Sequence, residues 1–247
     1  MKKSFFVLAF FTLFANFSFA VDNQELREIL SSEVKNSTFK PYIEQSSNGL
    51  VRLFVFNPSS ANSATEISLI KQALEYASKV AAPYGKDLME VKKSSYPRVK
   101  NFAIYALRKS QTEPYVLDMI GASDGETRAI ASFPEKADIF RVFVFIDDSP
   151  YNPSNYKTVS KSEFLLETIV NFIHEVYGHA FEVINQPSLA SASYGEQETR
   201  AYTVQLEGLK KLKQNYFGIF DASTQKLLDN YIEDTKAKIE YFKNNSY

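Results

Sequence analysis

The chain of 247 residues contains two histidines, His174 and His179, and a glutamate, Glu175, directly follows the first. The surrounding stretch reads His-Glu-Val-Tyr-Gly-His. Neutral imidazoles are good ligands for Zn²⁺, and a carboxylate beside them can take a proton from a water molecule. These residue types in this order form an HExxxH motif. They predict a catalytic zinc site with His174 and His179 as ligands and Glu175 as general base.

A third ligand is predicted from a second segment, in the helix expected over residues 195–214. Glu198 shares one face of that helix with residues that are mostly apolar, namely Ala201, Tyr202, Gln205, Leu209 and Leu212. Burying a carboxylate on such a face is costly unless it gains a partner. A divalent cation is one such partner, so Glu198 is the expected third ligand.

The spacing of the histidines requires a local change in the helix that carries them. Zinc ligands on a regular helix lie at i and i+4, whereas His179 is five residues after His174. A π-type bulge absorbs one extra residue and would rotate the second ring toward the first. Gly178 lies within this stretch, and glycine inside a helix costs about 1 kcal/mol relative to alanine. A glycine at this position therefore indicates a local structural need.

The donor for the oxyanion and the partners of the imidazole rings must come from other residue types, because the chain has no third histidine. Stabilising the negative charge that develops on a substrate oxygen needs a further donor. Tyr202 lies one helical turn beyond Glu198 and is the predicted donor, with Tyr194 and Tyr177 as alternatives. Glu167 and Asn171, earlier on the helix of the histidines, are candidate hydrogen-bond partners for an imidazole N–H.

The elements that must position these residues follow from hydrophobic periodicity. Strands are predicted over 51–56, 101–107, 115–120 and 139–146. Helices are predicted over 23–33, 64–82, 161–184, 195–214 and 223–243, and Ser160 with Glu163 forms a capping-box pattern before the third of these. This order predicts an α+β fold in which a small N-terminal mixed sheet with helices precedes a helical C-terminal part that carries the metal site.

The first 20 residues have the pattern of a secretory signal peptide. Met1-Lys2-Lys3 is basic, Phe5 to Phe14 is apolar, and Ser18-Phe19-Ala20 offers small residues for cleavage. We therefore predict one mature domain over 21–247, secreted or periplasmic, with no stable membrane span after cleavage. The Lys-Lys start and the absence of cysteine favour a bacterial source. A formal net charge of −1 and the lack of a basic block argue against nucleic acid as a partner.

The motif His-Glu-x-x-Gly-His followed by Glu-x-Arg-Ala (198–201) resembles that of the dipeptidyl peptidase III type of zinc peptidase, in the gluzincin group. The resemblance implies a zincin-like domain, zinc bound by His174, His179 and Glu198, and Glu175 as base. The substrate class of the family does not carry over, but the HExxxH site itself predicts a hydrolase of the peptidase kind, with a peptide or protein as the substrate. By analogy with zinc peptidases, the predicted strand 139–146 is a candidate edge strand for holding the substrate backbone.

Other functions are compatible with the same residues. One is a secreted binding or toxin-like module with an inactive metal site. Another is a non-haem iron oxygenase, which also uses two histidines and one carboxylate. The glutamate directly after His174 favours hydrolysis over oxygenation.

Overall fold

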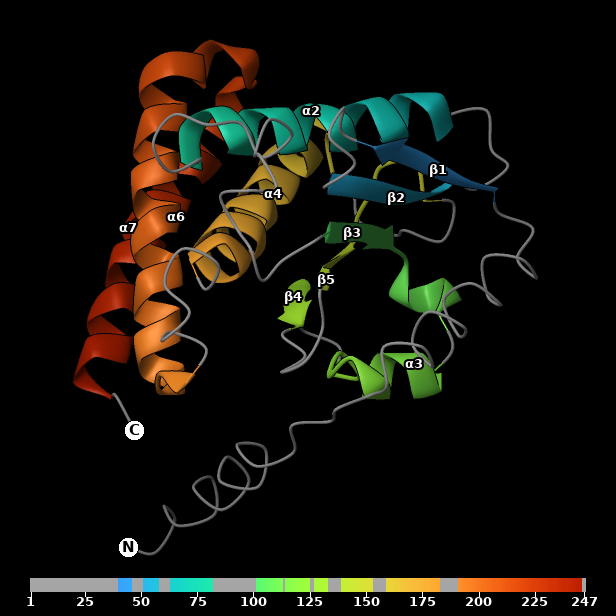
Figure 1. Cartoon of the computed structure of the whole chain (residues 1–247). Coiled ribbons are helices and arrows are strands. Elements are labelled where there is room, and N and C mark those ends of the chain that lie inside the picture. Colours follow the sequence, from blue (N-terminus) through green and yellow to red (C-terminus); the bar gives the residue numbers. More distant parts are fainter. Residues whose placement is uncertain are drawn as a thin grey trace, which may run out of the picture.

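The computed structural model describes residues 40–45, 51–57, 63–81, 101–112, 114–124, 127–132, 139–152, 159–182 and 191–245 (Figure 1). The predicted signal peptide (1–20) and the predicted helix 23–33 lie outside these residues. Within the described residues the protein combines one sheet with several helices, so the α+β prediction is confirmed.

The sheet is mixed and has five strands in the order β1-β2-β3-β5-β4. Its strands are β1 (Lys40–Gln45), β2 (Val51–Asn57), β3 (Asn101–Leu107), β4 (Ala129–Ser132) and β5 (Ile139–Phe145). The three inner strands β2, β3 and β5 run parallel, whereas β1 and β4 are antiparallel edge strands. In Figure 1 the helices of the C-terminal part lie at one end of this sheet.

Alternation along the strands divides the core between the two faces of the sheet. Val142 and Val144 of β5 join the main core, which also includes the helices, while Phe143 and Phe145 join a smaller cluster on the opposite face. On that second face Phe54, Tyr105 and Phe143 stack across three neighbouring strands, with centroid separations of 4.8 and 5.2 Å. The main core therefore lies between the sheet and the helices that carry the predicted ligands.

Four long helical segments build the other layer. They are α2 (Ser63–Ala81), α4 (Lys161–Phe172) continued by the π-helix η5 (Ile173–Phe181), α6 (Tyr194–Tyr216) and α7 (Ala222–Asn244). The Ser160 side chain accepts a hydrogen bond from the Glu163 N–H (3.0 Å), which confirms the Ser160 half of the predicted capping box. The short 3₁₀ helix η7 (Phe217–Ile219) joins α6 to α7, and the two long helices pack side by side (Figure 1).

The predicted strand over 115–120 is wrong, because Pro114–Met119 forms a short helix, α3. Its β-favouring residues were outweighed by Pro114, whose fixed φ suits the first position of a helix. Two edge strands were not predicted. β1 contains Pro41, which only an edge strand tolerates easily, and β4 has four residues, too few for a clear alternation.

The predicted role of 139–146 as an edge strand is also wrong. β5 lies between β3 and β4, so both of its sides are occupied within the sheet. The short strand β4 is the edge strand that packs near the π-helix.

Candidate metal centre

The π-helix η5 brings the two histidines together. Hydrogen bonds from i to i+5 place side chains five residues apart on the same side of the helix. The Nε2 atoms of His174 and His179 lie 3.2 Å apart, and the two rings are almost perpendicular at 82°. The predicted local π-type winding is confirmed, and it covers the whole of Ile173–Phe181.

Helix α6 brings Glu198 to the same point. Glu198 Oε1 lies 3.2 Å from Nε2 of His179, and Oε2 lies 3.5 Å from Nε2 of His174. Tetrahedral ligands with metal bonds of about 2.0–2.1 Å are themselves about 3.3 Å apart. The two nitrogens and the carboxylate oxygens therefore have separations close to those around a single divalent cation, and the three residues are a group that could hold a metal ion.

The donor set also has the chemistry of a cation site. The side chains of His174, His179 and Glu198 are only 12%, 10% and 11% exposed. The three side chains have lone pairs that point toward one another, and little water can reach them. They therefore need a positive charge between them, supplied by a proton or by a metal ion. Two imidazoles and one carboxylate suit zinc, and a site with three protein ligands leaves one position open.

A close contact between helices makes the arrangement possible. A Cβ on Gly178 would lie 2.8 Å from Cα of Ala201 and 2.9 Å from its Cβ. Any side chain at residue 178 would therefore push α6 away from η5. Because Ala201 is one turn after Glu198, the glycine sets how near the Glu198 carboxylate comes to the histidines.

His179 and Glu198 shift each other's pKa values. Burial opposes the charged form of His179, but the hydrogen bond to Glu198 and the charges of Glu175 and Glu198 raise its pKa on balance. Burial likewise disfavours ionised Glu198, yet hydrogen bonds from the two histidines lower its pKa to about 2. Glu198 is therefore ionised at neutral pH and attracts a cation.

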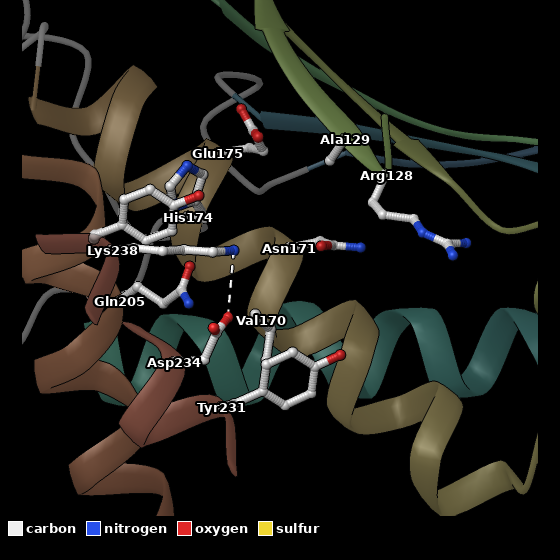
Figure 2. Close-up of a pocket in the computed structure, with 11 residues that line it drawn as sticks. Arg128, Ala129, Val170, Asn171, His174, Glu175, Gln205, Tyr231, Asp234 and Lys238 are labelled. Carbon is white, nitrogen blue, oxygen red and sulfur yellow. Dashed lines mark ion pairs between the residues drawn. The ribbon is translucent and has the colours of Figure 1, made fainter. Parts of the chain in front are cut away.

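A cavity of about 270 Å³ opens beside His174, and the predicted base Glu175 lines it too. Its other walls come from Arg128 and Ala129 at the edge strand β4, from α6, and from Tyr231, Asp234 and Lys238 of α7. Figure 2 shows Lys238 reaching from α7 into this space, with its ion pair to Asp234 (3.5 Å) dashed. A second cavity of about 150 Å³ shares Arg128, Asn171 and Tyr231 with the first, so the two are neighbours along α4.

Tyr202, the predicted hydrogen-bond donor to the oxyanion, is beside the metal ligands. Its ring centroid lies 4.4 Å from that of His174, and the residue lines the same cavity. Burial raises the pKa of its hydroxyl, and the negative charges of Glu198 and Glu175 raise it further. The hydroxyl therefore stays protonated at neutral pH and can donate a hydrogen bond.

The alternative tyrosines are placed differently. Tyr177 is 1% exposed and packs against Phe181 in the main core, outside the residues that line the cavity. Tyr194 is 68% exposed at the start of α6. Tyr202 is thus the one of the three that lines the cavity beside His174.

For His174, neither of the two candidate partners of an imidazole N–H is in place. Nδ1 of His174 is buried and has no hydrogen-bond partner. Asn171 lines the cavities, and Glu167 accepts a hydrogen bond from the Tyr231 hydroxyl, whose pKa is raised by burial and then by the charge of Glu167.

The sequence analysis did not predict the cavity residues from α7 and from the start of β4, namely Arg128 just before β4 and Tyr231, Asp234 and Lys238 on α7. The last three are spaced three or four residues apart, so they share one face of α7. That spacing was visible in the sequence, but the packing of α7 beside the metal ligands was not.

No protein-family model, curated protein or solved structure matches this chain. The likeness to gluzincins thus rests on the two motifs and on the grouping of His174, His179 and Glu198. Among the residues that the structure describes, no helix has the length and apolar character to cross a membrane.

Proposed function

We propose that this protein is a zinc-dependent hydrolase that cleaves peptide bonds. The observation that carries the proposal is the cluster of the two imidazole Nε2 atoms and the Glu198 carboxylate, beside a cavity that Glu175 also lines. The two nitrogens lie 3.2 Å apart, and they lie 3.2 and 3.5 Å from different oxygens of the carboxylate. The motif resemblance adds the expectation that the domain is zincin-like.

The residues of the chain divide the chemistry between them. Zinc held by His174, His179 and Glu198 would lower the pKa of water to about 7 and polarise the substrate carbonyl. Glu175 would accept a proton from the attacking water and pass it to the departing amine. Tyr202, neutral and adjacent to His174, would donate a hydrogen bond to the developing oxyanion.

A peptide substrate is supported by the edge strand. β4 pairs with β5 on one side, and no described strand pairs with its other side. An extended peptide can add to such an edge through main-chain hydrogen bonds. Ala129, the first residue of β4, and Arg128 just before it line the same cavity as His174 and Glu175, so this edge leads to the metal centre (Figure 2). The signal-peptide pattern supports action outside the cytoplasm.

Metal analysis and peptidase assays on three variants test this function. We expect about one zinc per wild-type chain, loss of zinc in His179→Ala, and zinc retention without cleavage in Glu175→Gln. Glu207→Gln, an exposed change on α6, is the matched control and should keep both zinc and activity. Wild-type protein without zinc, or a Glu175→Gln variant as active as wild type, would overturn the proposal. Zinc binding without cleavage of any peptide would instead support a binding module with an inactive site.

A further inference from the structure

A row of aromatic rings leads from the metal centre to the surface. The His174 ring contacts Tyr202 at 4.4 Å between centroids, and Tyr202 stacks on Phe242 of α7 at 5.7 Å with an interplanar angle of 14°. Phe242 in turn contacts Tyr194 at 5.8 Å and Tyr241 at 5.1 Å, in both cases edge to face. The rings of α6 and α7 are thus continuous with a metal ligand.

The outer end of this row is in contact with solvent. Tyr194 is 68% and Tyr241 is 61% exposed, and in the described part of the chain Ile219 is the one other large hydrophobic residue that is exposed. Two of these three exposed residues therefore belong to the row that begins at His174. Exposed apolar surface that gathers at one place marks a binding surface more often than scattered residues do.

The exposed rings lie near the predicted ligand Glu198 and the predicted base Glu175, as well as near the helix ends. Partial desolvation of the hydroxyl, followed by the negative charges of Glu198 and Glu175, together raise the pKa of Tyr194 to about 12, so its hydroxyl lies within electrostatic reach of a ligand and of the base. Lys238 lies 5.1 Å above the Tyr202 ring and lines the cavity beside the metal, where the row and the cavity meet.

Packing between α6 and α7 does not require the two exposed rings. Tyr202 and Phe242 make the stacked contact between the helices, and Leu209, Leu212 and Leu228 belong to the buried core beneath. Tyr194 and Tyr241 add their rings at the outer rim, where they remain more than half exposed.

We propose that Tyr194, Tyr241 and Phe242 form an aromatic shelf that binds a large apolar side chain, preferably an aromatic one, of the peptide substrate. This inference rests on the proposed peptidase function and adds its specificity. Aromatic faces bind such side chains by offset and edge-to-face contacts, and tyrosine loses little conformational freedom when it does so. Because an extended chain advances about 3.3–3.6 Å per residue, the bound side chain lies within about five residues of the scissile bond.

Peptide binding to the zinc-loaded, non-cleaving Glu175→Gln protein tests the shelf. The chain has no tryptophan, so a peptide with one tryptophan reports its own binding by fluorescence. We expect Tyr194→Ala and Tyr241→Ala, each made in the Glu175→Gln background, to weaken that peptide at least about fivefold. Tyr194→Phe and Tyr241→Phe keep the rings and should bind like the parent, as should the remote control Ile219→Ala.

A second measurement uses a peptide with serine in place of tryptophan, whose affinity is determined by competition. This peptide should bind more weakly than the tryptophan peptide, and the two alanine variants should leave its affinity unchanged. Three outcomes would overturn the shelf. The alanine variants could bind the tryptophan peptide as tightly as the parent, they could lose the same affinity for both peptides, or the parent could bind neither peptide. Zinc content and wild-type cleavage are measured separately, so failure of the shelf is distinguishable from failure of the peptidase.

Discussion

Gly178 lies directly against the backbone of Ala201, so that a Cβ at residue 178 would be 3.0 Å from the Ala201 carbonyl oxygen. Residue 178 belongs to the π-helix that carries both histidines, and Ala201 belongs to the helix that carries Glu198. The distance between the two helices at this contact determines whether three donors converge on one ion.

Gly178→Ala should therefore weaken zinc binding as well as stability. Forcing a methyl group into this contact should cost about 1–3 kcal/mol of folding stability and about 10–100-fold in zinc affinity, because Glu198 moves away from the rings. Zinc titration and urea denaturation measure the two effects. Gly218→Ala is the matched control, since a Cβ there meets nothing within 4 Å. Unchanged zinc affinity in Gly178→Ala would show that this contact does not place the carboxylate.

Zinc should stabilise the folded protein, because the ligands come from two helices that meet only in the folded state. At free zinc 100-fold above Kd, the gain is about 2.7 kcal/mol. For a domain of this size it should raise Tm by roughly 5–10 °C. Calorimetry with zinc and with a chelator measures the difference. His179→Ala should melt at one temperature in both conditions, whereas Glu175→Gln should respond like wild type.

A buried ion pair between Arg108 and Glu66 holds α2 against the end of β3. Arg108 Nη2 lies 2.6 Å from Glu66 Oε1, and both side chains are 0% exposed. Glu66→Gln leaves a buried guanidinium without its counter-charge, so we expect a loss of about 3–5 kcal/mol in urea denaturation. Glu233→Gln removes a surface pair with Lys236 and should cost less than about 1 kcal/mol. Similar costs for the two variants would contradict this account of the Arg108–Glu66 pair.

Asp221 should make stability depend on acidic pH. Its carboxylate caps α7 by accepting hydrogen bonds from the Thr224 N–H (2.8 Å) and the Ser223 hydroxyl (2.7 Å), which lower its pKa to about 2. Because the folded-state pKa lies below the unfolded value of about 3.9, this contribution is complete above pH 4 and disappears as pH falls toward 2.

Asp221→Asn provides the test of this pH dependence. The variant should melt at a lower temperature than wild type at pH 6, and the difference should shrink steadily between pH 4 and pH 2. Thermal melts across this range measure it. A difference that is constant with pH would exclude the carboxylate charge as its cause.

Periodicity predicted the long helices well, because each has an apolar stripe facing the core. Residues 195–214 and 223–243 are helical within α6 and α7, and the extra residue between the histidines indicated the π-type winding that the structure contains. Short elements were less predictable. α3 depends on one proline, and β4 has only four residues, so neither contains enough pattern to outweigh local propensity.

The three candidate ligands could be predicted from the amino-acid sequence, since no other histidines exist and Glu198 is a carboxylate on an otherwise largely apolar helix face. Three features became known from the fold. The ligand side chains come within 3.5 Å of one another, β4 and not β5 borders the cavity, and Lys238 and the aromatic row flank it. Residue type and periodicity describe one helix at a time, whereas the spacing between helices depends on how their side chains pack together. The contact between Gly178 and Ala201 is the clearest case, because the presence of a glycine does not show which backbone segment packs against it.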